Sequence, residues 1–193
     1  MHVTDEIRNW KGKSKELVAS LTESIEKDEK LCSQLIEFFK SGSHTEKGTA
    51  ADVMKHVSKD KPEIVASYID DLVDYINYKA PRVKWGVPET IGNLAQKHPT
   101  EVEKAIPNLL ENTKDKSTVV RWCAAFALTE ITKSNLAIRK ELAPKIEEIV
   151  QNEKNNGVKT VLESSKNDES ISLDVGLLKS GFNMITSFVQ KKN

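Results

Sequence analysis

The sequence predicts an all-α fold in which antiparallel helical hairpins stack side by side as a solenoid. Three observations indicate this fold. Apolar residues recur at the 3.6-residue spacing of amphipathic helices, and no segment alternates usefully with the two-residue period of a strand. The 193 residues include only eight glycines and six prolines, which favours helices over many short strands joined by turns. The chain also resembles itself when it is shifted by 37 residues.

Eight apolar runs each predict one helix of a few turns. The runs cover residues 17–25, 31–39, 50–57, 65–76, 83–94, 102–110, 120–131 and 138–150. Short polar or proline-containing segments separate them, so consecutive helices are expected to be antiparallel neighbours. Pro88 lies inside the fifth run, where an interior proline predicts a kink or a new helix start.

The internal repeat becomes visible when the sequence is aligned with itself at an offset of 37 residues. Trp85 then falls on Trp122. In the preceding unit the same offset places Ile69 on Ile106. The same offset of 37 residues therefore aligns two successive pairs of units, which indicates a structural repeat. A single helical hairpin cannot bury its apolar face alone, whereas a row of similar hairpins makes one continuous core.

One unit carries a family signature, formed by Pro107, Asp115, Val120 and Arg121. These residues stand at the spacing of the signature Pro, Asp, Val and Arg of HEAT repeats, and the chain resembles the HEAT-repeat family. The resemblance implies a right-handed α-solenoid with a period of about 37 residues, in which Pro144 is the matching proline of the next unit. It also implies that the aspartate caps a second helix and that the arginine joins a ladder of Asp–Arg pairs between repeats.

Neighbouring units depart from this signature at the ladder positions. Tyr78 and Asn152 stand where the family has aspartate, and Lys84 stands where it has arginine. We therefore expect the ladder to be broken on either side of the central unit. The repeating basic positions Lys47, Lys84 and Arg121 have two interpretations: they pair between repeats, or they present charge to an acidic partner.

The whole chain, residues 1–193, is interpreted as a single HEAT-like repeat domain. Residues 1–61 are divergent N-terminal repeats, residues 62–151 are the best-matching repeats, and residues 152–193 are a decayed repeat, a loop and a C-terminal helix. The last helix is expected from one apolar face of Leu178, Phe182, Ile185 and Val189. We expect it to cap the exposed end of the stack; a partner-binding or mobile tail is the alternative.

The candidate binding surface follows from positions around the second helix of the central unit. At about 100° per residue, Val120, Ala124 and Leu128 share one sector and Trp122 lies on the opposite side. Second helices line the concave face of HEAT-like stacks, so the resemblance places a tryptophan from each of two units there. We expect a protein partner to bind this face through Trp85, Glu89, Gln96, Trp122, Phe126 and Lys133. The alternative is that both tryptophans pack between repeats.

Composition argues against several classes of function. Lysine plus arginine and aspartate plus glutamate balance at 29 residues each, so no overall field draws the chain to nucleic acid or to an anionic membrane. The four histidines are scattered and no phosphate loop or nucleophile motif occurs, so we expect no metal, no cofactor and no small-molecule substrate.

Cysteine usage and the apolar segments bear on location. Cys32 and Cys123 stand in unrelated helical runs, which fits small core residues in a reducing compartment. The N-terminus has no signal-like apolar region, and no segment is long and apolar enough for a membrane span. We expect a cytoplasmic protein.

These observations favour a non-catalytic scaffold or adaptor that binds a protein partner through the concave face of a short HEAT-like solenoid. The alternative is a HEAT-like DNA-binding protein related to DNA alkylation-repair glycosylases, with Asp52 or Glu89 in the place of that family's acidic residue. The charge balance argues against the alternative, because gripping several phosphates needs a local excess of lysine and arginine.

Overall fold

The computed structural model describes residues 2–166, and these residues contain helices and no strand. The elements follow one another as α1 (Val3–Asn9), α2 (Ser14–Lys27), α3 (Lys30–Ser41), α4 (His44–Asp60), α5 (Pro62–Ala66), α6 (Ile69–Val73), α7 (Pro81–Leu94), the 3-10 helix η1 (Glu101–Ala105), α8 (Ile106–Asn112), α9 (Thr118–Ser134), α10 (Leu136–Asn152), α11 (Asn156–Glu163) and the 3-10 turn η2 (Ser164–Lys166). The all-α prediction is confirmed.

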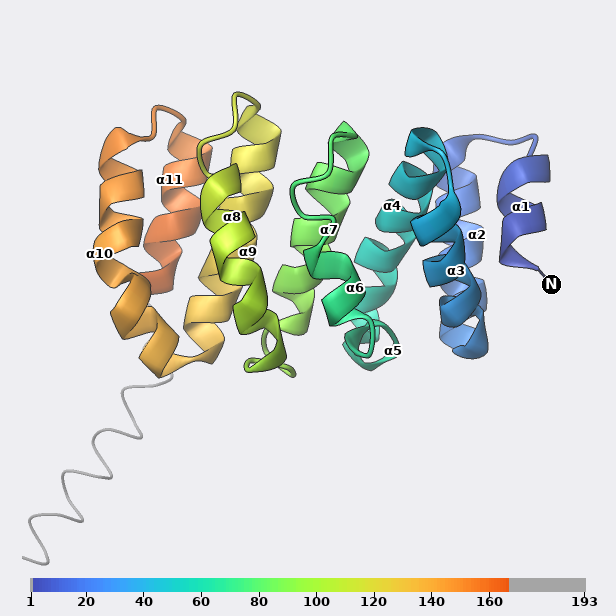
Figure 1. The fold of residues 1–193 in the computed structure, drawn as a ribbon, viewed down its shortest axis with the longest axis horizontal. Coiled ribbons are helices and arrows are strands. Elements are labelled where there is room, and N and C mark those ends of the chain that lie inside the picture. The colour runs from blue at the N-terminus through green and yellow to red at the C-terminus, as the bar shows by residue number, and fades with distance from the viewer. Residues whose placement is uncertain (1, 167–193) are drawn as a thin grey trace, which may run out of the picture.

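The helices form two layers that run along the stack (Figure 1). One layer contains the second helix of each hairpin, in which α2 packs against α4, α4 against α7, α7 against α9 and α9 against α11. The other layer contains α3, the pair α5–α6, the pair η1–α8, and α10. Each element therefore contacts its neighbours along the row, which is the arrangement of a helical solenoid.

The core lies between the two layers and continues from one hairpin to the next. Large side chains with no exposed surface occur along its whole length, including Leu35 and Phe39 of α3, Met54 of α4, Ile91 of α7 and Leu128 of α9. Burying side chains of this size contributes about 1.5–3 kcal/mol each before the entropy cost of folding. No single hairpin could bury them without its neighbours.

Local structure departs from the prediction in four places. The run at residues 65–76 is divided into α5 and α6, and the run at residues 102–110 begins as the 3-10 helix η1. Helix α1 was not among the predicted runs. Of the two predictions for Pro88, a new helix start is wrong, because α7 continues through this buried proline.

The C-terminal helix predicted from Leu178, Phe182, Ile185 and Val189 lies outside the described residues. Within residues 2–166, no helix is long and apolar enough to cross a membrane.

Candidate functional site

An apolar stripe on α9 is the most exposed large apolar surface of the described chain. Val119, Trp122 and Phe126 stand at the i, i+3 and i+7 positions of one helix face. Val119 is 49% exposed and Trp122 is 38% exposed. The opposite face of α9 is buried, as the predicted core sector of Val120, Ala124 and Leu128 requires. We call Val119, Trp122 and Phe126 the α9 stripe.

The two aromatic rings of the α9 stripe stack on each other. The Trp122 and Phe126 rings are nearly parallel, with an interplanar angle of 3° and centroids 5.8 Å apart. Phe126 also lies against α7 at Gly92, where a Cβ atom would come within 2.6 Å of a Phe126 ring carbon. The absence of a side chain at Gly92 is therefore what allows Phe126 to lie across α7. Phe126 in turn provides the surface on which Trp122 rests.

Trp85, the counterpart of Trp122 in the preceding unit, is in a different environment. It is half-buried on α7. Its indole Nε1 atom is enclosed and has no hydrogen-bond partner among the described residues. Trp122 is exposed on the surface, as a partner-binding residue would be. Trp85 is half-buried, which is closer to the alternative of packing between repeats.

The part of the second-helix face that α4 and α7 contribute is polar. Arg82 donates to Asp52 from Nε at 3.1 Å and from Nη2 at 2.5 Å. Glu89 lies 3.9 Å from the ammonium of Lys55 and accepts a hydrogen bond from the Cys123 thiol at 3.5 Å. Both carboxylates considered for the glycosylase alternative, Asp52 and Glu89, are engaged by basic side chains.

The remaining predicted site residues lie at the far end of these helices. Gln96 is exposed just beyond the end of α7. Lys133 lies in the last turn of α9 and pairs with Glu130 at 3.0 Å. Val119 was not among the predicted site residues, and its counterpart in the preceding unit is the charged Arg82.

The ladder between repeats is continuous over the two junctions beside the central unit, so the break predicted from Lys84 and Asn152 is wrong. The departure predicted at Tyr78 is confirmed, because the Lys47 ammonium lies over the Tyr78 ring there. Lys84 donates to Asp115 at 2.7 Å. Arg121 donates to Glu153 from Nε at 2.7 Å and from Nη2 at 3.1 Å. Lysine replaces arginine at the first junction, and Glu153, one residue beyond the expected Asn152, replaces aspartate at the second.

Lys47 occupies the corresponding position one unit earlier and uses another kind of partner. It is buried, and its ammonium donates to the carbonyl oxygens of Phe39 at 2.5 Å and Lys40 at 2.6 Å. It also lies 5.1 Å from the Tyr75 ring centroid and 5.8 Å from that of Tyr78. A cation over an aromatic face here takes the place of the ion pair. The basic column is therefore used for contacts within the solenoid.

The other signature residues have structural surroundings. Asp115 accepts a hydrogen bond from the backbone N–H of Ser117 at 2.8 Å, so it holds the turn before α9, while Ser117 is the N-cap residue. Val120 is buried. Pro107 and Pro144 are exposed, the first in the opening turn of α8 and the second within α10.

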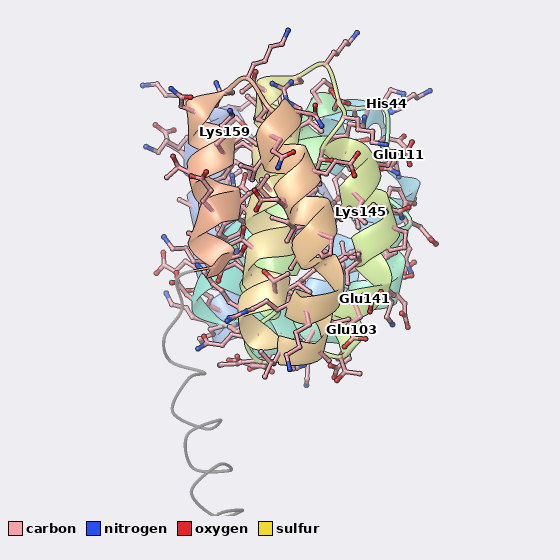
Figure 2. All side chains as sticks on the ribbon, turned by 90° about the vertical axis from the view of Figure 1, so that its left-hand side faces the viewer. His44, Glu103, Glu111, Glu141, Lys145 and Lys159 are labelled. Atoms are coloured by element: carbon pink, nitrogen blue, oxygen red, sulfur yellow. The ribbon has the colours of Figure 1, made fainter. Side chains whose placement is uncertain are left out.

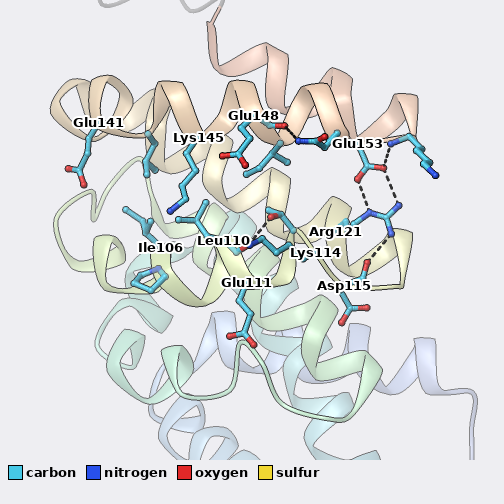
Figure 3. Close-up of a pocket in the computed structure, with 16 residues that line it drawn as sticks. Ile106, Leu110, Glu111, Lys114, Asp115, Arg121, Glu141, Lys145, Glu148 and Glu153 are labelled. Atoms are coloured by element: carbon cyan, nitrogen blue, oxygen red, sulfur yellow. Dashed lines mark hydrogen bonds and ion pairs between the residues drawn. The ribbon is translucent and has the colours of Figure 1, made fainter.

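A groove in the first-helix layer was not predicted from the sequence. It lies between α8 and α10 and has a volume of about 950 Å³. Ile106, Leu110, Leu142 and Ile149 give it an apolar floor. Figure 2 shows Glu111 on one side and Glu141 and Lys145 on the other, and Figure 3 shows the groove in close-up with the Arg121–Glu153 pair at one end.

No protein-family model and no curated protein matches this sequence. Solved structures do match. A designed armadillo repeat protein in complex with the peptide (KR)4 is 18% identical, with 84% of this chain and 78% of that chain covered and a TM-score of 0.68. A computationally designed armadillo repeat protein for modular peptide recognition is 19% identical, with 77% of this chain and 72% of that chain covered and a TM-score of 0.64. At such identities the likeness establishes the fold, which is a helical repeat solenoid of the armadillo type.

Proposed function

We propose that this protein is a non-catalytic scaffold that binds a peptide segment of a protein partner on its second-helix face, with the α9 stripe as the anchor. The observation that carries the proposal is the exposure of Trp122 while its ring is stacked on Phe126. A tryptophan that is exposed and already oriented offers a large contact area at a low cost in conformational entropy. Such surfaces are favoured anchors for protein partners.

The neighbouring helix supplies polar groups beside this anchor. Glu89 on α7 contacts Cys123 of α9, so its carboxylate lies next to the helix that carries the stripe. We expect the bound segment to place an apolar side chain against Trp122 and an uncharged hydrogen-bond donor such as an amide toward Glu89, whose carboxylate lies 3.9 Å from the Lys55 ammonium. Peptide binding is also what the names of two similar designed proteins describe, and it supports a peptide as the ligand class. HEAT-family membership remains part of the proposal.

We do not expect a purely basic peptide to be the ligand, because the acidic residues near the α9 stripe already have basic partners. Asp52 is already paired with Arg82, and Glu130 is paired with Lys133. Further basic residues of a peptide would have to displace these cations. We therefore expect the affinity to depend mainly on the apolar anchor residue of the peptide.

Selection of peptides from a random display library against the full chain tests this function. Selected peptides are expected to contain an apolar or aromatic anchor and to lose at least about tenfold in affinity, roughly 1.4 kcal/mol, for the Trp122→Ala variant. Trp10→Ala is the matched control, because Trp10 lies in the segment between α1 and α2, remote from α9. Peptides that bind both variants as tightly as the wild type would rule out the α9 stripe as the site.

A titration with duplex DNA distinguishes the alternative function. The proposal predicts no binding at moderate salt. Tight binding that weakens steeply as the salt concentration rises would replace the scaffold function with a nucleic-acid function.

A further inference from the structure

The groove between α8 and α10 lies on the opposite layer from the α9 stripe and has the features of a helix-binding site. Its apolar residues come from two neighbouring first helices: Ile106 and Leu110 are one turn apart on α8, and Leu142 and Ile149 are two turns apart on α10. Exposed charged residues, including Glu141 and Lys145, lie along its edge. An apolar trough with charged edges fits one amphipathic helix.

Residues 173–190 of this chain have the matching pattern. Leu178, Phe182, Ile185 and Val189 stand at i, i+4, i+7 and i+11, which places them on one face of a helix. Between Leu178 and Val189 the only charged residue is Lys179. A helix over these 18 residues would be about 27 Å long, close to the roughly 25 Å of the 17-residue α10. The segment is therefore long enough to fill the groove along α10.

The course of the chain brings this segment to the correct end of the groove. Helix α11 returns antiparallel to α10, so the described chain ends at Lys166 on the side of the stack where α10 begins (Figure 1). Ile106 and Glu141 lie at the same end of the groove (Figure 3). Residues 167–172 can span up to about 20 Å between Lys166 and the groove.

The apolar residues of the terminal hairpin lie inside the stack. Val158 and Leu162 of α11 are 1% and 0% exposed, and Val150 of α10 is 8% exposed. The large apolar side chains that are exposed in the described chain lie on α9 and not on α10 or α11. The groove is an open hollow on the first-helix layer with apolar residues in its lining.

From these relationships we infer that residues 173–190 bind as an amphipathic helix in the groove between α8 and α10. The segment enters beside Ile106 and Glu141 and runs parallel to α10. Phe182 and Ile185 pack on Leu110 and Ile149. Lys179, near the entrance, lies at the level of Glu141.

A paramagnetic label in the full chain tests this binding. Ser187 lies on the helix side opposite Phe182 and Ile185, so a nitroxide on a Ser187→Cys variant would not occupy the contact. Cys32 and Cys123 are each 1% exposed, and burial raises the pKa of the Cys32 thiol to about 12, so the label reacts at the new cysteine. We expect the amide signals of α8 and α10 near Leu110 and Ile149 to lose intensity.

The competing occupants give different results in the same experiment. Loss of intensity around Val119 and Trp122 would place the segment on the α9 stripe and overturn the proposal. Loss that appears only when labelled chain is mixed with isotope-enriched unlabelled chain would assign the groove to a second copy, and no loss at any helix would show that the segment is unbound. Either result overturns the proposal.

Two variants within the segment test the apolar contact without changing the solenoid. Phe182→Asp in the labelled chain is expected to restore the signals of α8 and α10. Ser180→Asp, on the side of the helix away from Phe182, is the matched control and is expected to leave the loss unchanged. Equal effects of both substitutions would contradict a specific apolar contact.

Discussion

Arg121 on α9 donates two hydrogen bonds to the carboxylate of Glu153, the residue that follows α10, at 2.7 and 3.1 Å. The Glu153 side chain is only 4% exposed. Its carboxylate also accepts hydrogen bonds from the backbone N–H groups of Lys154 at 2.8 Å and Asn155 at 2.7 Å. Arg121 holds the pKa of Glu153 below its usual value, although burial acts in the opposite direction. This pair ties α9 to the turn that begins α11.

Removing the arginine is expected to destabilise the solenoid. Arg121→Ala leaves the Glu153 carboxylate enclosed with only backbone donors, and an uncompensated buried charge is costly. We expect the free energy of unfolding to fall by about 2–4 kcal/mol. Urea denaturation of the full chain, followed by far-UV circular dichroism, measures this loss.

An exposed ion pair provides the control for Arg121. Lys97 and Glu63 are 3.2 Å apart with side chains 61% and 53% exposed. Lys97→Ala is expected to change the free energy of unfolding by less than about 1 kcal/mol. Equal losses for the two variants would show that the enclosure of Glu153 is not what gives the Arg121 pair its effect.

The close approach of α4 and α7 gives a second prediction. A Cβ atom at Gly86 would lie 3.0 Å from the backbone carbonyl atoms of Ala51. Backbone atoms cannot move aside by changing a rotamer, so the two helices would have to separate. We expect Gly86→Ala to lower the free energy of unfolding by about 1–3 kcal/mol in urea denaturation.

Gly157 is the comparison position for this prediction. It is exposed at the start of α11, and a Cβ atom there would meet only the side-chain oxygen of Asn155, at 3.2 Å. Gly157→Ala is expected to stay within about 0.5 kcal/mol of the wild type. A Gly86→Ala variant as stable as Gly157→Ala would show that α4 and α7 tolerate a wider spacing.

The helices and their repetition could be predicted from the sequence because both are local properties. The apolar spacing around Leu128 or Ile91 determines which helix face is buried, wherever the helix lies. The same reasoning found the exposed side of Trp122. Helix α1 was missed because its apolar content is small, with Val3 buried and Ile7 half-buried.

The ladder and the groove could not be predicted in the same way because they depend on distances between units. Lys84 differs from the arginine of the repeat signature, and this difference predicted a missing ion pair. Its ammonium nevertheless reaches Asp115 as an arginine would. The signature position falls on Asn152, whereas the carboxylate that pairs with Arg121 belongs to Glu153, one residue further on. The hollow between α8 and α10 reflects the spacing of two helices, which no local pattern encodes.

Gly92 provides a prediction about the α9 stripe itself. A methyl group at this position would overlap the Phe126 ring, 2.6 Å from its nearest carbon, so Gly92→Ala is expected to displace Phe126 and disturb its stacking on Trp122. The indole N–H signal of Trp122 in an NMR spectrum should shift, while that of Trp10 stays in place. Unchanged Trp122 and Phe126 signals would show that the ring orientation does not depend on Gly92.

The start of α4 gives a prediction about pH. Glu46 accepts hydrogen bonds from Arg8 Nε at 2.9 Å and from the backbone N–H of Ser43 at 2.7 Å. The Ser43 hydroxyl accepts from the Glu46 N–H, which completes a capping box. Arg8 first, and then Ser43, lowers the pKa of Glu46 from 4.5 to about 2.

The sign of the pH effect follows from this lowered pKa. Because the folded-state pKa of Glu46 is below the unfolded value of 4.5, the stabilisation is present above pH 4.5 and is lost as the pH falls toward about 2. Glu46→Gln is expected to lower the free energy of unfolding by about 1–2 kcal/mol at neutral pH. The difference from the wild type should shrink between pH 4.5 and 2.

Urea denaturation of both proteins between neutral pH and pH 2 measures this difference, and a further substitution separates it from the general effect of acid. Glu29→Gln changes a carboxylate at the exposed start of α3, where the side chain makes no capping hydrogen bond, so this variant is expected to follow the wild type throughout. If the Glu46→Gln difference were instead constant over the whole pH range, the contribution of Glu46 would come from its shape and hydrogen bonds. The ionised carboxylate would then not be what joins α1 to the first turn of α4.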